Sequence, residues 1–195
     1  MNYDLIIRNG VVVDGTGNPW FKADVAIEKG KIAKIGYSLS GEDLVDAKGM
    51  VVCPGFIDPH THSDALLVCS ESKKTELFKG RIRQGITTEV IGVDGFSMAP
   101  LNAEKKELLR KQFETLSPEE LSWDWSTFEE YLNRLEKKKV PVNVVPLVGQ
   151  GTVRVAVMGY ENRTSSKDEL KEMKRLVGEA MKQGAFGLST GLVYN

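Results

Sequence analysis

His60 and His62 are the only histidines in the 195-residue chain, and a single residue separates them. They follow residues 50–57, an apolar run typical of a buried strand. Alternate residues of an extended backbone point to the same side, so a pair spaced in this way can direct two imidazoles at one point. Imidazole nitrogens bind zinc and related divalent metals. The pair therefore predicts a metal site at the end of this strand.

Asp94 is the candidate for a third ligand. It precedes a glycine at the end of the next predicted strand, and a carboxylate beside two imidazoles is a common zinc environment. An aspartate before a glycine is also common in turns that bind nothing. Asp58 and Asp64 flank the histidines, where carboxylates can fix the imidazole tautomer, although ordinary loop aspartates are an equal alternative. We expect a metal site of His60, His62 and Asp94, with the two flanking aspartates as hydrogen-bond partners.

The segments that must position these side chains fall into two parts. Residues 1–50 consist of short strand-like runs with turns between them, as in a small sheet or part of a sandwich. From residue 51 onward, strand-like and helix-like segments alternate, which predicts an α/β fold with a parallel sheet. Its strands are expected at 50–57, 86–92, 142–148 and 185–190, and its main helices at 74–84, 103–115, 127–139 and 166–183. Four such units are half of the eight that close a (β/α)8 barrel.

Two further strand ends carry candidate substrate-binding residues, because chemistry in parallel barrels gathers at the C-terminal ends of strands. Gln150 and Arg154 follow the third strand and offer donors to an amide or a carboxylate, although Arg154 could equally be a surface residue. Ser189 and Tyr194 lie at the fourth strand end. No third histidine is present to serve as the base of a serine triad within this chain. We assign no residue a catalytic proton-transfer role.

The composition excludes several classes of function. The chain has 26 Lys and Arg against 27 Asp and Glu, so it lacks the basic excess of a nucleic-acid-binding protein. No apolar run approaches the ~18 residues of a membrane span, and the first residues lack the pattern of a signal peptide. A cytoplasmic location is expected. Cys53, in the predicted first barrel strand, is expected to be a small core residue.

The motifs resemble the amidohydrolase superfamily, and most closely its N-acyl-D-amino-acid deacylase branch. The matching segments are residues 4–10, 13–17, 54–64, 84–88, 95–100, 149–154 and 187–192. The resemblance implies a distorted (β/α)8 barrel preceded by part of a small β-sandwich, here residues 51–195 and 1–50. It also implies one or two zinc ions and hydrolysis of the amide bond of N-acyl-D-amino acids.

Two motifs depart from the family pattern. The family commonly has Asn-Cys-Gly, with a zinc-binding cysteine, where this chain has Val93-Asp94-Gly95, so Asp94 would replace a thiolate with an oxygen. The family often has Gly-His-Gly where this chain has Gly149-Gln150-Gly151.

The family's remaining ligands and its general-base aspartate belong to later strands. We therefore expect an incomplete site with little activity in isolation, and either self-association or a complementing C-terminal half. One alternative is a cyclic-amide hydrolase, but the predicted fourth strand, residues 185–190, lacks the lysine that such enzymes carboxylate. The other alternative is a noncatalytic interaction domain that keeps the scaffold.

Overall fold

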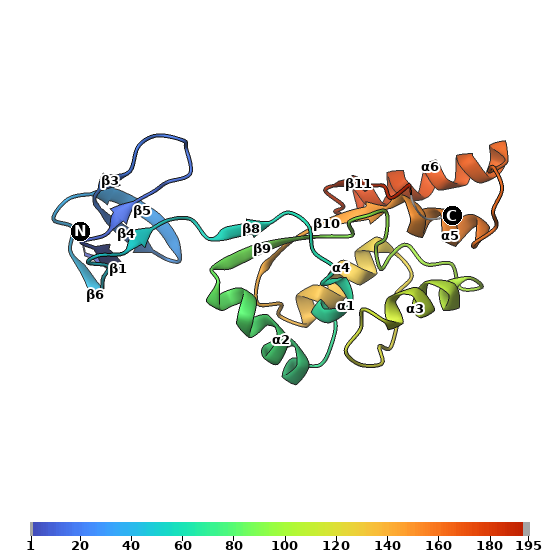
Figure 1. The fold of residues 1–195 in the computed structure, drawn as a ribbon, viewed down its shortest axis with the longest axis horizontal. Coiled ribbons are helices and arrows are strands. Elements are labelled where there is room, and N and C mark those ends of the chain that lie inside the picture. The colour runs from blue at the N-terminus through green and yellow to red at the C-terminus, as the bar shows by residue number, and fades with distance from the viewer. Residues whose placement is uncertain (1, 193–195) are drawn as a thin grey trace. The chain divides into compact units, whose positions relative to one another are not determined.

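The computed structural model describes residues 2–192, which form two compact units. The first unit extends to Gly55 and the second begins at Phe56. Each is described below by itself. The ribbon in Figure 1 is coloured along the chain, with the first unit in blue and cyan.

The first unit is built from short strands in two sheets. A four-stranded sheet has the order β5-β4-β1-β6, and a three-stranded sheet has the order β3-β2-β7. A small core of Val12, Ala23 and Val25 contains residues of both sheets. The strand bounds are β1 Tyr3–Arg8, β2 Val11–Val12, β3 Phe21–Lys22, β4 Asp24–Glu28, β5 Lys31–Gly36, β6 Gly41–Asp46 and β7 Val51–Val52.

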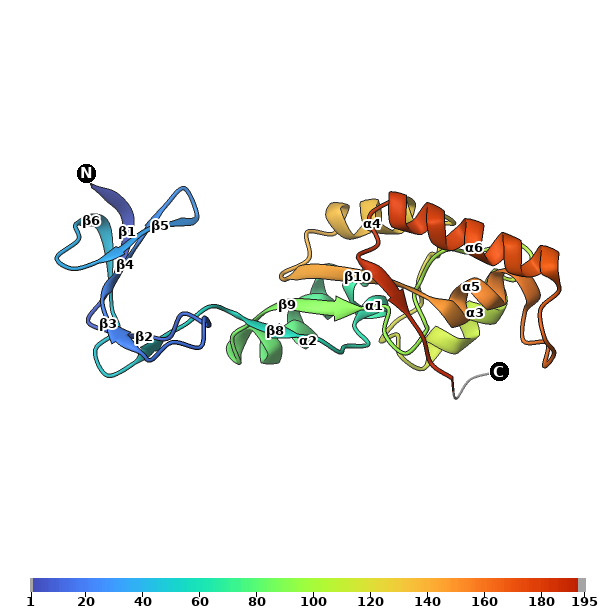
Figure 2. The same ribbon diagram turned by 90° about the horizontal axis from the view of Figure 1, so that it is seen from above.

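The second unit is a mixed α/β structure around a parallel sheet. Its strands are β8 (Phe56–Asp58), β9 (Ile86–Ile91), β10 (Asn143–Gly149) and β11 (Gly187–Ser189). They lie in sequence order, and each pairs in parallel with its neighbour. Figures 1 and 2 show these strands running side by side through the second unit. Their C-terminal ends therefore share one edge of the sheet.

The helices of the second unit bury the apolar face of this sheet. In Figure 1, the first four of them are drawn below the strands. Ile91 of β9 and Val148 of β10 are fully buried in one core with side chains of the helices. The helix bounds are α1 Asp64–Leu67, α2 Glu71–Arg83, α3 Lys106–Glu114, α4 Phe128–Lys137, α5 Gln150–Met158 and α6 Lys167–Lys182.

Local sequence explains where the two best-defined helices begin. Thr127 before α4 and Ser166 before α6 each form a capping box with the glutamate three residues later. Such a box satisfies backbone N–H groups that a helix leaves unpaired at its start.

The prediction of one continuous strand over residues 50–57 is wrong, because two separate strands occupy this segment. Val51 and Val52 pair with β2 of the first unit, whereas Phe56–Asp58 pair with β9. Pro54 and Gly55 separate the two strands, and neither residue favours a continuous ladder. Along the chain, the boundary between the two units consequently falls between residues 55 and 56, five residues after the expected boundary between residues 50 and 51. Cys53 lies in this break and is exposed, so its assignment to the core is also wrong.

Candidate metal centre

The structure brings His60, His62 and Asp94 together. The histidines follow β8 and Asp94 follows β9, so the parallel pairing of these two strands places their ends side by side. The Nε2 atoms of His60 and His62 lie 3.1 Å and 3.3 Å from the same oxygen of Asp94, Oδ2. One ligand atom from each residue lies within 4.8 Å of the others. All three side chains are partly exposed, which leaves the group accessible from solvent.

These distances fit a divalent cation. Ligand atoms about 2.0–2.1 Å from a tetrahedral zinc ion are about 3.3 Å from one another. The two measured contacts with Asp94 Oδ2 match that separation. Two imidazole nitrogens and one carboxylate oxygen are donors that zinc accepts, and they leave a position for a further ligand or for water. The three residues can therefore hold zinc with little rearrangement.

The loop that carries Asp94 has an unusual backbone. Asp94 itself has a φ of 55°, in the left-handed region that few non-glycine residues adopt and that aspartate tolerates better than most. Gly92 and Gly95, on either side, have φ values of 73° and 82°. A β-carbon at Gly92 would lie 2.1 Å from the carbonyl oxygen of Leu147 in β10, so no other residue fits there. This turn directs Asp94 back toward the histidines.

The two flanking aspartates do not hold the imidazoles as expected. Asp58 Oδ1 accepts the backbone N–H of His60 at 3.2 Å, which fixes the main chain rather than the ring. Asp64 is buried, and its Oδ1 accepts the backbone N–H of Gly92 at 2.9 Å. Burial raises the pKa of Asp64 to about 7. Asp64 therefore supports the Asp94 loop, because its carboxyl group is hydrogen-bonded to the backbone of that loop.

The expected substrate-binding residues have different positions. Gln150 begins α5 directly after β10, half-buried at the same edge of the sheet as His60, His62 and Asp94. Arg154 lies one turn further along, and its Nη2 donates to the carbonyls of Glu161 and Arg163 at 2.7 Å and 2.9 Å. The Nη2 group of Arg154 thus holds the loop after α5, because it is hydrogen-bonded to two carbonyls of that loop. Tyr194 lies outside the described residues.

Ser189 also has intramolecular partners. Its hydroxyl donates to the carbonyl of Gly92 and accepts the N–H of Gly95 at 3.1 Å. The hydroxyl is therefore engaged with the Asp94 loop, and a substrate contact of Ser189 stays a prediction.

Thr152 and Ser97, which were not among the expected site residues, anchor the same region. The backbone N–H of Thr152 donates to the carbonyl of Gly95 at 3.1 Å. The hydroxyl of Thr152 donates to the carbonyl of Ser97 and accepts its N–H, both at 2.8 Å. Both side chains are buried. Both residues lie in segments that resemble the family, 95–100 and 149–154, but the local sequence did not show that they contact each other, because they are 55 positions apart.

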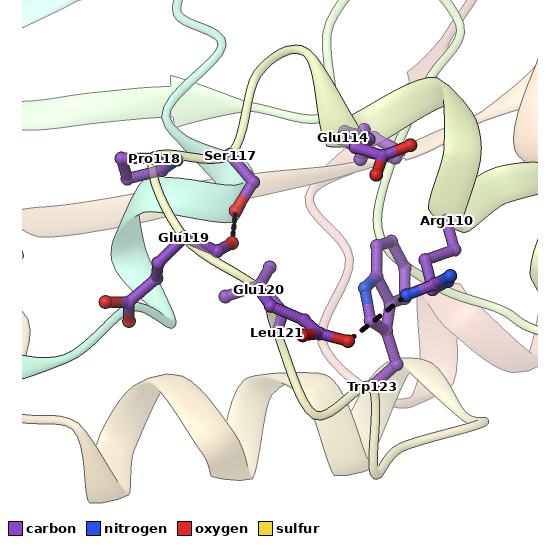
Figure 3. Close-up of a pocket in the computed structure, with 9 residues that line it drawn as sticks. Arg110, Glu114, Ser117, Pro118, Glu119, Glu120, Leu121 and Trp123 are labelled. Carbon is purple, nitrogen blue, oxygen red and sulfur yellow. Dashed lines mark hydrogen bonds and ion pairs between the residues drawn. The ribbon is translucent and has the colours of Figure 1, made fainter.

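A separate hollow of about 350 Å³ lies beside α3, away from the metal ligands. Figure 3 shows Arg110 from α3 and Glu120 from the following loop, joined across it by an ion pair of 3.5 Å. Its lining residues include none of the expected site residues. Among residues 2–192, no helix is both long enough and apolar enough to cross a bilayer.

Comparisons with known proteins show the family to which this chain belongs. A model of the amidohydrolase family matches residues 43–195, so the chain belongs to this family. The chain is 38% identical to N-acyl-D-aspartate deacylase and 36% identical to D-aminoacylase, both from Alcaligenes xylosoxydans xylosoxydans. Each match covers 98% of the chain but only 37% and 38% of the relative. The chain thus spans less than two fifths of the length of these relatives.

Solved structures show the same likeness. A crystal structure of D-aminoacylase matches 99% of the chain with a TM-score of 0.83 and 36% identity. N-acyl-D-glutamate deacylase from Bordetella bronchiseptica, in complex with zinc and a phosphonate mimic of the tetrahedral intermediate, matches the whole chain with a TM-score of 0.82 and 31% identity. The chain covers 39% and 40% of these two structures. A binuclear metal centre has been described for D-aminoacylase.

Proposed function

We propose that this chain forms the N-terminal part of a zinc-dependent hydrolase that cleaves the amide bond of N-acyl-D-amino acids. The observation that carries the proposal is the convergence of His60, His62 and Asp94 within 4.8 Å. It occurs in a chain that resembles three N-acyl-D-amino-acid deacylases over almost its full length. The substrate class is taken from those relatives.

We further propose that β8–β11 and their helices are the first four units of a (β/α)8 barrel, and that the first unit contributes part of a β-sandwich. The side chains of Phe56, Ile57, Phe186 and Leu188 in or beside the two edge strands are about half exposed or more. Apolar side chains and unpaired strand edges of this kind favour a partner that continues the sheet. A C-terminal half that supplies the remaining strands is the partner that fits best.

In the proposed reaction, His60, His62 and Asp94 hold the ion at the carboxyl edge of the sheet. A bound zinc ion would polarise the scissile carbonyl and acidify water. The chain itself provides the ordered ligands and an accessible approach, since all three side chains are partly exposed. A general base is not assigned to any residue among 2–192, so proton transfer requires a group supplied with the rest of the barrel.

A direct test of the metal site is a zinc titration of the chain by isothermal calorimetry. The chain is expected to bind zinc, and His60→Ala is expected to abolish most of the affinity. Equal binding by the two proteins would contradict the proposed site.

A test of the activity uses a chimera in which this chain replaces the matching 37% of N-acyl-D-aspartate deacylase. The chimera is expected to hydrolyse N-acetyl-D-aspartate but not the L-enantiomer, and to lose activity with His60→Ala. The isolated chain is the control and is expected to show little or no turnover. A folded, zinc-loaded chimera without activity would contradict the proposed reaction.

A further inference from the structure

The hydroxyl of Ser189 joins the two ends of the loop that carries Asp94. It donates to the carbonyl of Gly92 and accepts the N–H of Gly95 at 3.1 Å. These two glycines form the two ends of the loop, and each has a positive φ. A single side chain from β11 therefore sets the distance between the residues that flank Val93 and Asp94.

The other contacts of the loop act on one end each. Asp64 accepts the N–H of Gly92, and Thr152 donates its backbone N–H to the carbonyl of Gly95. The hydroxyl of Ser189, in contrast, bonds to both ends. The segment that follows β11 also packs closely on the loop, since a β-carbon at Gly95 would lie 2.8 Å from the backbone nitrogen of Gly191.

The conformation that these contacts hold has an energetic cost. A non-glycine residue is less stable in the left-handed region than in the right-handed one. Asp94 adopts this conformation, and in it Oδ2 faces the Nε2 atoms of both histidines. Without an anchor, the loop can relax and direct the carboxylate elsewhere.

We propose that Ser189 is a positioning residue that presents the Asp94 carboxylate to the divalent cation held by His60 and His62. This inference rests on the metal site proposed above. Ser189 does not touch the cation in this account, and it acts only through the loop of residues 92–95. The expected effect is on how tightly and with which geometry the ion is bound.

The test compares Ser189→Ala with Ser166→Ala in the full chain. Both replacements remove a hydroxyl that accepts a backbone N–H, but Ser166 caps α6 and has no contact with the Asp94 loop. Calorimetry with zinc measures affinity, and visible absorption of bound cobalt(II) reports the ligand geometry. Ser189→Ala is expected to weaken zinc binding about 10–100-fold, as loss of a ligand's hydrogen-bond partner does, and to shift the cobalt spectrum toward that of Asp94→Ala. Ser166→Ala is expected to change neither.

A second pair of variants separates the hydroxyl from the volume of the side chain. Ser189→Thr keeps the hydroxyl. Valine has nearly the same shape as threonine but no hydroxyl, so Ser189→Val differs from Ser189→Thr mainly in that group. Threonine is expected to retain the affinity and spectrum of the unchanged chain, and valine to behave like alanine. This pair also serves if the alanine variant does not fold.

The outcomes distinguish this inference from the metal site itself. If the unchanged chain binds zinc through His60 but Ser189→Ala and Ser189→Val bind it equally well with an unchanged cobalt spectrum, the role of Ser189 is refuted and the site stands. If the unchanged chain binds no zinc, or His60→Ala binds it equally well, both proposals are refuted.

Discussion

Nε2 of His62 and Oδ2 of Asp94 lie 3.3 Å apart, although they follow different strands. The contact exists because β8 and β9 are parallel neighbours whose ends lie at one edge of the sheet. His60 reaches the same carboxylate oxygen from the same strand end. Two imidazoles and one carboxylate oxygen thus converge at this edge of the sheet.

His62→Ala should lower the zinc affinity of the chain by more than the ~10-fold that loss of an outer hydrogen-bond partner costs, because it removes a ligand itself. Calorimetric titration with zinc measures the change. Asp43→Asn is a suitable control, since Asp43 is exposed in the first unit. A similar loss in the control would show that zinc binds to surface carboxylates instead.

Asp94→Cys should change the preference among metals. A thiolate is a softer ligand than a carboxylate, so the variant should bind zinc more tightly relative to manganese than the unchanged chain does. Competition titrations of zinc against manganese measure this ratio. Asp94→Asn should weaken binding of both ions, because it removes the charge and keeps the shape. An unchanged ratio in the cysteine variant would mean that residue 94 does not contact the ion.

Gly92→Ala should destabilise the second unit by about 2 kcal/mol or more, because it combines a positive φ with a steric overlap. The new β-carbon would meet the Leu147 carbonyl oxygen at 2.1 Å. Gly178→Ala is the matched control, since Gly178 lies exposed within α6 with open space around it. The control should be more stable than the unchanged chain by about 0.5–1 kcal/mol. Urea denaturation followed by circular dichroism measures both, and equal stabilities would contradict the role of Gly92.

Glu89→Gln should change how stability depends on pH. Glu89 is fully buried in β9, where desolvation raises its pKa above 4.5 even though Arg81 Nε lies 3.0 Å from Oε1. A carboxyl whose pKa is higher in the folded state stabilises the fold below its unfolded pKa. This contribution is lost as pH rises through the folded value. Denaturation from pH 4 upward should show a steeper decline for the unchanged chain than for Glu89→Gln.

The exposed residue Glu104 provides the control for this measurement. Glu104→Gln should keep the pH dependence of the unchanged chain. If Glu89→Gln has the same pH dependence as that control, burial does not govern the titration of Glu89.

Much of the second unit was predictable because local signals agreed with the final structure. The β-branched run that forms β9 and the capped amphipathic segment that forms α6 were found within two residues of their bounds. Pro146 fits within β10 opposite Ile91, and its carbonyl accepts the N–H of Phe186. The proximity of the two histidines to Asp94 was predicted from their positions at the ends of neighbouring strands.

The remaining features depend on contacts between distant residues. Pro54 and Gly55 indicate a break in the apolar run of residues 50–57, but only the pairing partners show that its halves join different sheets. The helix α5 was missed because it begins directly after β10, at Gln150, without a separating loop. The contact of Ser189 with Gly92 joins residues 97 positions apart, and no local pattern encodes such a contact.

The Asp94 loop receives its anchors in a fixed order during translation. Asp64 emerges from the ribosome before the loop does, Thr152 follows well after it, and Ser189 comes last among the anchors. A nascent chain that ends before Ser189 therefore contains the two histidines and Asp94 but lacks the hydroxyl that joins the loop ends. The hydrogen bonds that join the two loop ends can therefore form only after β11 has been synthesised.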